Sequence, residues 1–216
     1  MYDAAVTDSA CGTGCGPGAQ SGTSVHVLDL AHNGTRDVVL DLYSGGAHCC
    51  TIEQVFAPRA DGSYAKVAEH NFRDPGDRIL DLNHNGRFEF LTADDRFAYA
   101  FTDFAASGLP VQVLSFSGGR FHDVTRQYRH RVARDGDRWL GAFRSQAAKH
   151  FADTTGYIAA WAADEDLLGK HVAVDRYLNA QARAGHLNQL LGAQMPSGRQ
   201  FVAALHRFLH RLGYLR

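Results

Sequence analysis

A short internal repeat constrains the fold of this chain more than any other feature. Residues 27–40 read VLDLAHNGTRDVVL, and residues 79–92 read ILDLNHNGRFEFLT, 52 positions further along the chain. Six of these fourteen positions are identical, and two more are conservative exchanges. Agreement at this level within one chain indicates an internal duplication, so we expect the same structural unit to occur twice.

Strand signals surround both copies of the repeat. Residues 25–30 and 38–43 alternate or run apolar, and Asn33-Gly34 between them is a strong hairpin signal. Further segments with the same character, separated by Gly-containing turns, are 51–56, 63–68, 111–116 and 120–125. Each copy therefore reads as four short strands, like one blade of a β-propeller. Closure takes about 4 to 8 blades, so another element must cover a two-repeat array.

From about residue 137 the apolar spacing changes to the period of a helix. Apolar stripes at this spacing cover residues 139–147, 158–168, 174–181 and 201–212. Gly169, Gly185 and Gly213 stand where helices end, and Ser197 stands where the last helix begins. Trp139 and Trp161 fall in this region and are expected in its core.

The sequence thus predicts an α+β protein, mainly β with α. Two four-stranded, propeller-blade-like repeats are followed by a small helical C-terminal region. We place the β-repeat domain at residues 1–126 and the helical domain, packed on it, at residues 127–216.

The net charge of −1 conceals two halves of opposite sign. Residues 1–116 contain 7 Lys/Arg and 15 Asp/Glu, whereas residues 117–216 contain 15 and 8. The acidic half is suited to binding cations, and the basic half is suited to docking onto the acidic half or onto an anionic partner. Two solvated surfaces that merely differ in charge explain the split equally well. A hydrophobic content of 45% argues against disorder. No segment of the sequence is expected to form a membrane span or a signal peptide.

Four cysteines lie in the first quarter of the chain: Cys11, Cys15, Cys49 and Cys50. Their spacing matches the paired CxxC motifs of zinc sites poorly, so we expect disulfides and an oxidising compartment, either secreted, periplasmic or at the cell surface. Adjacent residues of a strand point to opposite faces, which favours two bridges between the first pair and the second. With reduced cysteines, His48 would instead offer a copper or zinc ligand.

The repeated loops carry oxygen donors at the spacing of a calcium site. Calcium takes about six to eight oxygens, from positions 1, 3, 5, 7 and 9 of a loop with Gly at position 6. The second loop supplies these as Asp81, Asn83, Asn85, the carbonyl of Arg87, and Glu89, with Gly86 at the turn. The first supplies Asp29, Asn33, the carbonyl of Thr35, and Asp37, but has Ala31 at position 3. We therefore expect the second loop to bind calcium more strongly than the first.

Segments 29–37 and 81–89 resemble the DxDxDGxxD/E loops of FG-GAP and VCBS repeat proteins. In that family such loops join strands of propeller blades, bind calcium, and occur in secreted or surface proteins that mediate adhesion or contact carbohydrates and proteins. The resemblance implies an extracellular, calcium-stabilised binding or structural module with a protein or glycan partner. Both segments depart from the family pattern where Asn or Ala replaces Asp.

The same loops are also consistent with plain Asn-Gly hairpins, in which Asp and Asn side chains only cap backbone groups. Acids at positions 1 and 9 in both copies favour the metal interpretation. His32 and His84 at position 4 do not suit a hard cation, and we expect them to be exposed turn residues.

Rival chemistries have less support. Asp94-Asp95 and Asp164-Glu165-Asp166 could supply a glycosidase with carboxylates, but such neighbours are more common on exposed turns and helices. A set of basic residues in the second half of the chain could bind nucleic acid or an anionic glycan, although such a set more often forms a solvated face. Its members are Arg126, Arg129, Arg131, Arg134, Arg138, His206, Arg207, His210 and Arg211.

No set of residues specifies a reaction, so the sequence favours a binding or structural module over an enzyme. The alternative function is a secreted, possibly carbohydrate-active hydrolase with its site between the β and helical halves. The residues that would line that site are Asp94, Asp95, Tyr99 and Asp103.

Overall fold

The computed structural model describes residues 11, 14–18, 24–46, 48–148, 154–188 and 195–215. The chain divides into two compact units. The β unit comprises Met1–Asp95 and Gln112–Val124, and the helical unit comprises Arg96–Val111 and Thr125–Arg216. Residues 96–111, which the sequence predicts as part of the β-repeat domain, group with the helices in the structure.

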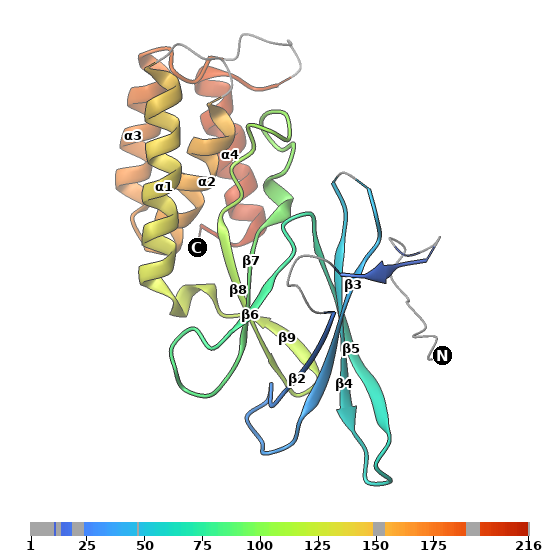
Figure 1. Ribbon diagram of the computed structural model, residues 1–216. Helices are drawn as coiled ribbons and strands as arrows, with labels where there is room; N and C mark the ends of the chain where they lie inside the picture. The colour runs from blue at the N-terminus through green and yellow to red at the C-terminus, as the bar shows by residue number, and fades with distance from the viewer. Residues whose placement is uncertain are drawn as a thin grey trace. The chain divides into compact units, whose positions relative to one another are not determined.

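The strands form two antiparallel sheets (Figure 1). The first has the order β1-β3-β4-β5, with β2 also paired to β3. Its strands are β1 (Gly16–Pro17), β2 (Val25–Leu28), β3 (Asp37–Tyr43), β4 (Thr51–Pro58) and β5 (Tyr64–Arg73). The second has the order β6-β7-β8-β9. Its strands are β6 (Arg78–Leu80), β7 (Glu89–Ala93), β8 (Val111–Ser117) and β9 (Arg120–Asp123).

The register of β3 and β4 gives the first sheet two different faces. Val39 pairs with Val55 and Asp41 with Glu53, so these four side chains share one face, because side chains alternate along a strand. On that face the valines join a core with Phe72, Phe90 and Leu114, which come from both sheets. The opposite face carries Leu42 and Ile52, which pack against cysteines.

The described part of the helical unit contains four α-helices that pack alongside one another (Figure 1). They are α1 (Arg129–Ala147), α2 (Thr155–Leu167), α3 (His171–Arg183) and α4 (Gly198–Leu212). Trp161 lies in their core and Trp139 packs against it, as expected. Within the described residues, no helix is long and apolar enough to cross a membrane.

The α+β prediction is confirmed: the described chain forms two antiparallel sheets and four helices. A closed propeller ring is not formed by the strands of the described part of the chain. Helix α1 begins at Arg129, earlier than the apolar period indicated, because its first two turns are largely polar. Ser197 stands at the N-cap of α4, but its side chain makes no capping hydrogen bond.

Candidate metal centre in the paired Asp-Asn-Gly loops

The first loop, between β2 and β3, is folded around the Asp29 carboxylate. Its two oxygens accept the amide protons of Asn33 and Gly34, each at 2.9 Å. The side-chain oxygen of Asn33 in turn accepts the amide proton of Thr35 at 2.9 Å and its hydroxyl proton at 2.6 Å. The hydrogen bond from Asn33 is the largest of the contacts that hold the pKa of Asp29 below its ordinary value. Position 1 of this loop therefore carries a full negative charge at neutral pH.

The second loop, between β6 and β7, repeats this arrangement. Asp81 accepts the amide protons of Asn85 at 3.0 Å and Gly86 at 2.9 Å, and Asn85 accepts that of Arg87 at 2.8 Å. The hydrogen bond from Gly86 contributes most to lowering the pKa of Asp81. The duplication in sequence is thus a duplication of local structure.

The acids at position 9 are buried, each with 4% of its surface exposed. Glu89 Oε2 accepts the amide proton of Leu82 at 3.1 Å. Asp37 accepts backbone hydrogen bonds from Leu30 and Ala31. Its Oδ2, however, is buried with no hydrogen-bond partner among the described residues. Burial raises the pKa of Asp37, and the nearby Asp29 carboxylate adds to the rise. Position 9 of the first loop therefore has an unsatisfied oxygen beside a second negative charge.

Hard oxygen donors dominate both loops, which is the chemistry that calcium prefers. In the part of the chain that the structure describes, no three His, Cys, Asp or Glu side chains gather to hold a metal ion. An ion in either loop would therefore depend on amide and main-chain oxygens in addition to two carboxylates. The second loop offers one amide more, Asn83, where the first has Ala31.

The two loops also contact each other, which the sequence did not predict. His32 Nδ1 lies 3.1 Å from the carbonyl oxygen of Gly86 and donates a hydrogen bond to it. A Cβ atom on Gly86 would lie only 2.8 Å from Cε1 of the His32 ring. His32 and His84 are exposed turn residues, as expected, with φ of 52° and 58°. The two loops therefore lie side by side at His32 and Gly86.

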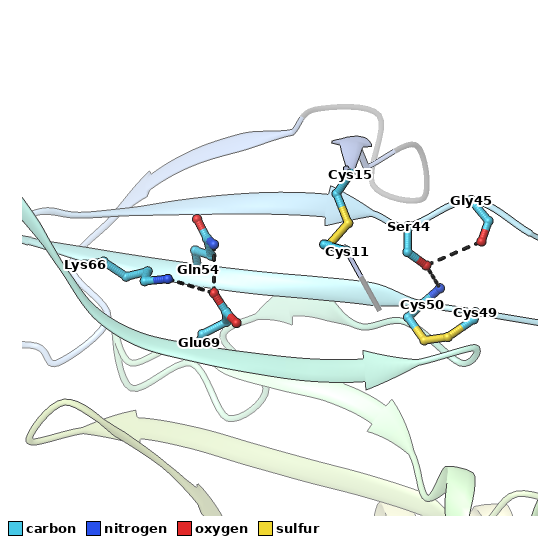
Figure 2. Close-up of a disulfide and its surroundings, with 9 residues drawn as sticks. All are labelled: Cys11, Cys15, Ser44, Gly45, Cys49, Cys50, Gln54, Lys66 and Glu69. Carbon is cyan, nitrogen blue, oxygen red and sulfur yellow. Dashed lines mark hydrogen bonds and ion pairs between the residues drawn. A yellow bond between two sulfur atoms is a disulfide. The ribbon is translucent and has the colours of Figure 1, made fainter. Parts of the chain in front are cut away.

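The cysteines are paired differently from the expected arrangement. Disulfides join Cys11 to Cys15 and Cys49 to Cys50, so no bridge links the first pair to the second (Figure 2). A turn in which the Gly14 amide donates to the Cys11 carbonyl, at 2.8 Å, brings the Cα atoms of Cys11 and Cys15 to 5.2 Å. That spacing suits a disulfide. Cys49 and Cys50 precede β4, so the alternation of side chains along a strand does not apply to them.

Both disulfides lie on the same face of the first sheet, where Cys11 and Cys50 pack with Leu42 and Ile52. The Cys50 amide donates to Ser44 Oγ at 2.8 Å (Figure 2). No described cysteine is free, so a thiolate metal site beside His48 is not formed. His48 Nδ1 instead lies 3.7 Å from a carboxylate oxygen of Asp74.

The residues considered for a hydrolase site fall in both units. Asp94 and Asp95 belong to the β unit, and Tyr99 and Asp103 to the helical unit. Contrary to expectation, Asp94 is buried rather than exposed on a turn. Burial raises the pKa of Asp95, while the positive charge of Arg73 opposes the rise.

The acidic run in α2 is likewise not an exposed helix face, because Asp164 and Asp166 are buried. The Asp164 carboxyl group contacts Asp135 of α1. Asp135 Oδ2 already accepts the Val111 amide proton at 2.8 Å and the Trp139 indole proton at 3.0 Å. Burial first, and then the charge of Asp135, raise the pKa of Asp164 well above its ordinary value. The raised pKa favours the protonated form of Asp164, which can donate a hydrogen bond to Asp135 on the neighbouring helix.

Part of the basic set stabilises the helical unit. Arg126 donates to the carbonyl oxygens of Gly213 at 2.8 Å and Tyr214 at 3.1 Å, after the end of α4. Arg129 donates to the carbonyl of Leu168 at 3.2 Å, after the end of α2. Both side chains hydrogen-bond carbonyl oxygens that follow the ends of helices, instead of contributing to a surface that binds nucleic acid.

A shallow groove of about 440 Å³ lies on α3 and α4. Asp175, His206, Arg207, His210 and Leu215 line it, and His206 Nε2 lies 2.8 Å from Asp175 Oδ1. The spacing of His206 and His210, four residues apart on a helix, is the sequence signal that indicates their shared face.

No known protein family matches the chain, and no solved structure matches it. Over 135 residues, 62% of the chain, it is 29% identical to a probable thylakoid lumen protein of Synechocystis sp.. The same length is 24% identical to an uncharacterized protein of Sinorhizobium fredii. The matched regions cover 40% and 21% of these relatives, so the chain spans less than half of either protein.

Proposed function

We propose that this chain is an extracytoplasmic binding or structural module of the FG-GAP/VCBS type, stabilised by calcium in its paired loops. The observation that carries the proposal is the repeated geometry of the loops. In both copies a carboxylate at position 1 organises the turn, and a second, buried carboxylate stands at position 9.

Electrostatics favour a cation over a plain hairpin in the first loop. Asp29 is held ionised by backbone amides, and Asp37 lies close enough for that charge to raise its pKa. A plain Asx turn needs only the first of these acids. Calcium would offset the repulsion and would satisfy Asp37 Oδ2, which has no hydrogen-bond partner among the described residues.

The remaining parts of the proposal have separate support. Two disulfides within one small unit favour an oxidising compartment. The thylakoid lumen, named for one relative, is also outside the cytoplasm. The sequential order of β6 to β9, and of β2 to β5, suits blade-like repeats that present their loops to a protein or glycan partner.

Thermal unfolding with and without calcium, after treatment with a chelator, tests the proposal. Calcium should raise the melting temperature, by mass action equivalent to about 2.7 kcal/mol at 100 times its Kd. Because the second loop has the additional amide ligand, Asp81→Ala should remove most of the shift and Asp29→Ala less of it. Ala31→Asp should strengthen binding by the first loop.

Asp61→Ala is the matched control. Asp61 Oδ1 also accepts a backbone amide proton, from Ser63 at 2.9 Å, but it caps the tight β4–β5 hairpin. This variant should lose stability without losing the calcium response. A wild-type melting curve that calcium leaves unchanged would mean that both loops are plain hairpins.

A further inference from the structure

A second group of carboxyl groups lies inside the β unit: Asp41 on β3, Glu53 on β4, and Asp77 in the segment before β6. Their exposed fractions are 3%, 2% and 8%. Asp41 and Glu53 are directly opposite each other across the two strands, which places their Cβ atoms about 4.5 to 5.5 Å apart. The carboxyl group of Asp77 meets that of Glu53. Two strands and a loop thus bring three acids together on the inner face of the first sheet.

Glu53 and Asp77 carry buried carboxyl oxygens that the described side chains leave unsatisfied. Glu53 Oε2 and both carboxyl oxygens of Asp77 are buried with no hydrogen-bond partner among the described residues. His70 stands opposite Glu53 on β5, but its ring packs on Phe72 and Phe121, at centroid distances of 4.5 and 5.0 Å. Burial lowers the pKa of His70, which disfavours a positive charge on its ring.

The chain covers this cluster closely. A Cβ atom on Gly18 would lie 1.8 Å from Asp41 Oδ1, so only glycine fits where the backbone passes this carboxylate. The backbone at Gly18 therefore passes directly against the Asp41 carboxylate.

We propose that Asp41, Glu53 and Asp77 bind a divalent metal cation of the hard, oxygen-preferring class, such as calcium or magnesium, at a site separate from the paired loops. Such ions are held by carboxylates and main-chain oxygens. Buried carboxylates that lack a paired charge are strongly unfavourable, and a divalent ion neutralises two of them at once.

The side-chain rotamers seen here do not form a set of three metal ligands. The strand register, however, fixes the Cβ positions of Asp41 and Glu53, so rotation about side-chain bonds alone can bring their oxygens together.

Counting bound ions in the full chain tests the proposal independently of the loops. After chelator treatment, equilibrium dialysis against calcium, and separately against magnesium, is applied to the wild type, to Glu53→Gln and to the double variant Asp29→Ala/Asp81→Ala. The double variant should retain one bound ion, and Glu53→Gln should bind one ion fewer than the wild type. If calcium does not bind to the loops, the wild type should still bind this one ion.

Asp77→Asn provides a second, more exposed substitution, and circular dichroism verifies that each variant is folded. Either cluster variant, if folded, should lower affinity for the retained ion at least tenfold. An unchanged ion count in Glu53→Gln and Asp77→Asn would overturn the proposal. A second combination of results would also overturn it: the double variant binds no ion, and Glu53→Gln is more stable than the wild type at pH 7. In that case the three acids share protons instead of binding a metal ion.

Discussion

Replacing Asp164 with Asn should remove a pH-dependent loss of stability from the helical unit. Asp164 is completely buried in α2 and faces Asp135, which is already held by the Val111 amide, the Trp139 indole and the Arg138 guanidinium. The two carboxyl groups are in hydrogen-bond contact, which requires a proton between them, and the raised pKa of Asp164 leads us to expect that proton on Asp164. An asparagine side chain has nearly the same shape, and its NH₂ group can donate the same hydrogen bond at any pH.

The sign and size of the effect follow from proton linkage. Burial and Asp135 raise the pKa of Asp164 in the folded state. When the pH is above the ordinary pKa of an aspartate, the folded protein therefore keeps a proton that the unfolded chain has released. The free energy of unfolding then falls by about 1.4 kcal/mol per pH unit as pH rises, until the raised pKa is reached. Asp164→Asn should abolish that part of the slope.

Urea unfolding at pH 5, 6 and 7, followed by tryptophan fluorescence, measures this difference. Trp139 and Trp161 both belong to the helical unit, so the signal reports on the unit that is changed. Asp137→Asn, an exposed position on α1, is the control and should follow the wild-type profile. If Asp164→Asn and the wild type lose stability in parallel between pH 5 and pH 7, Asp164 is ionised in the folded protein and the reasoning is wrong.

Two further predictions concern the β unit. Alkylation of the unfolded, unreduced protein should label no cysteine, and reduction should cost only about 1 to 2 kcal/mol per disulfide, because the loops closed are very short. A cost near 4 kcal/mol per bridge would instead indicate bridges between the two pairs of cysteines. Gly86→Ala should lower the melting temperature more than Gly34→Ala, although both positions have a left-handed φ, because only at Gly86 would the new Cβ meet His32. Equal losses would show that the contact between the loops is weak.

Local signals were sufficient to predict most of the secondary structure. Gly169, Gly185 and Gly213 were assigned to helix ends because glycine readily adopts a left-handed conformation, and their φ angles are 83°, 80° and 82°. The segments expected as strands overlap β2 to β5, β8 and β9. The capping bonds of Asp29 and Asp81 also follow from short-range spacing, since both partners lie within five residues.

Features that depend on packing between distant segments could not be predicted. Asp41 lies between Leu40 and Leu42, a pattern typical of a strand with one solvated face, yet Asp41 and the opposite Glu53 are both buried by the rest of the unit. The contact of His32 with Gly86 joins residues 54 positions apart. The pairing of the cysteines depends on Cys49 and Cys50 lying before β4 instead of within a strand, which local sequence does not indicate.

The way the chain alternates between the two units affects how the protein can be made and divided. It passes from the β unit to the helical unit at residue 96, returns at residue 112, and leaves again at residue 125. During synthesis the β unit is complete while most of the helical unit is still to be translated. Until α2 and α4 emerge, Phe101 lacks the Phe201 ring and the Thr155 hydroxyl that it contacts in the folded protein. In a fragment that ends at residue 126, the segment around Phe101 would remain exposed. We therefore expect α2 and α4 to protect this segment from aggregation by covering it.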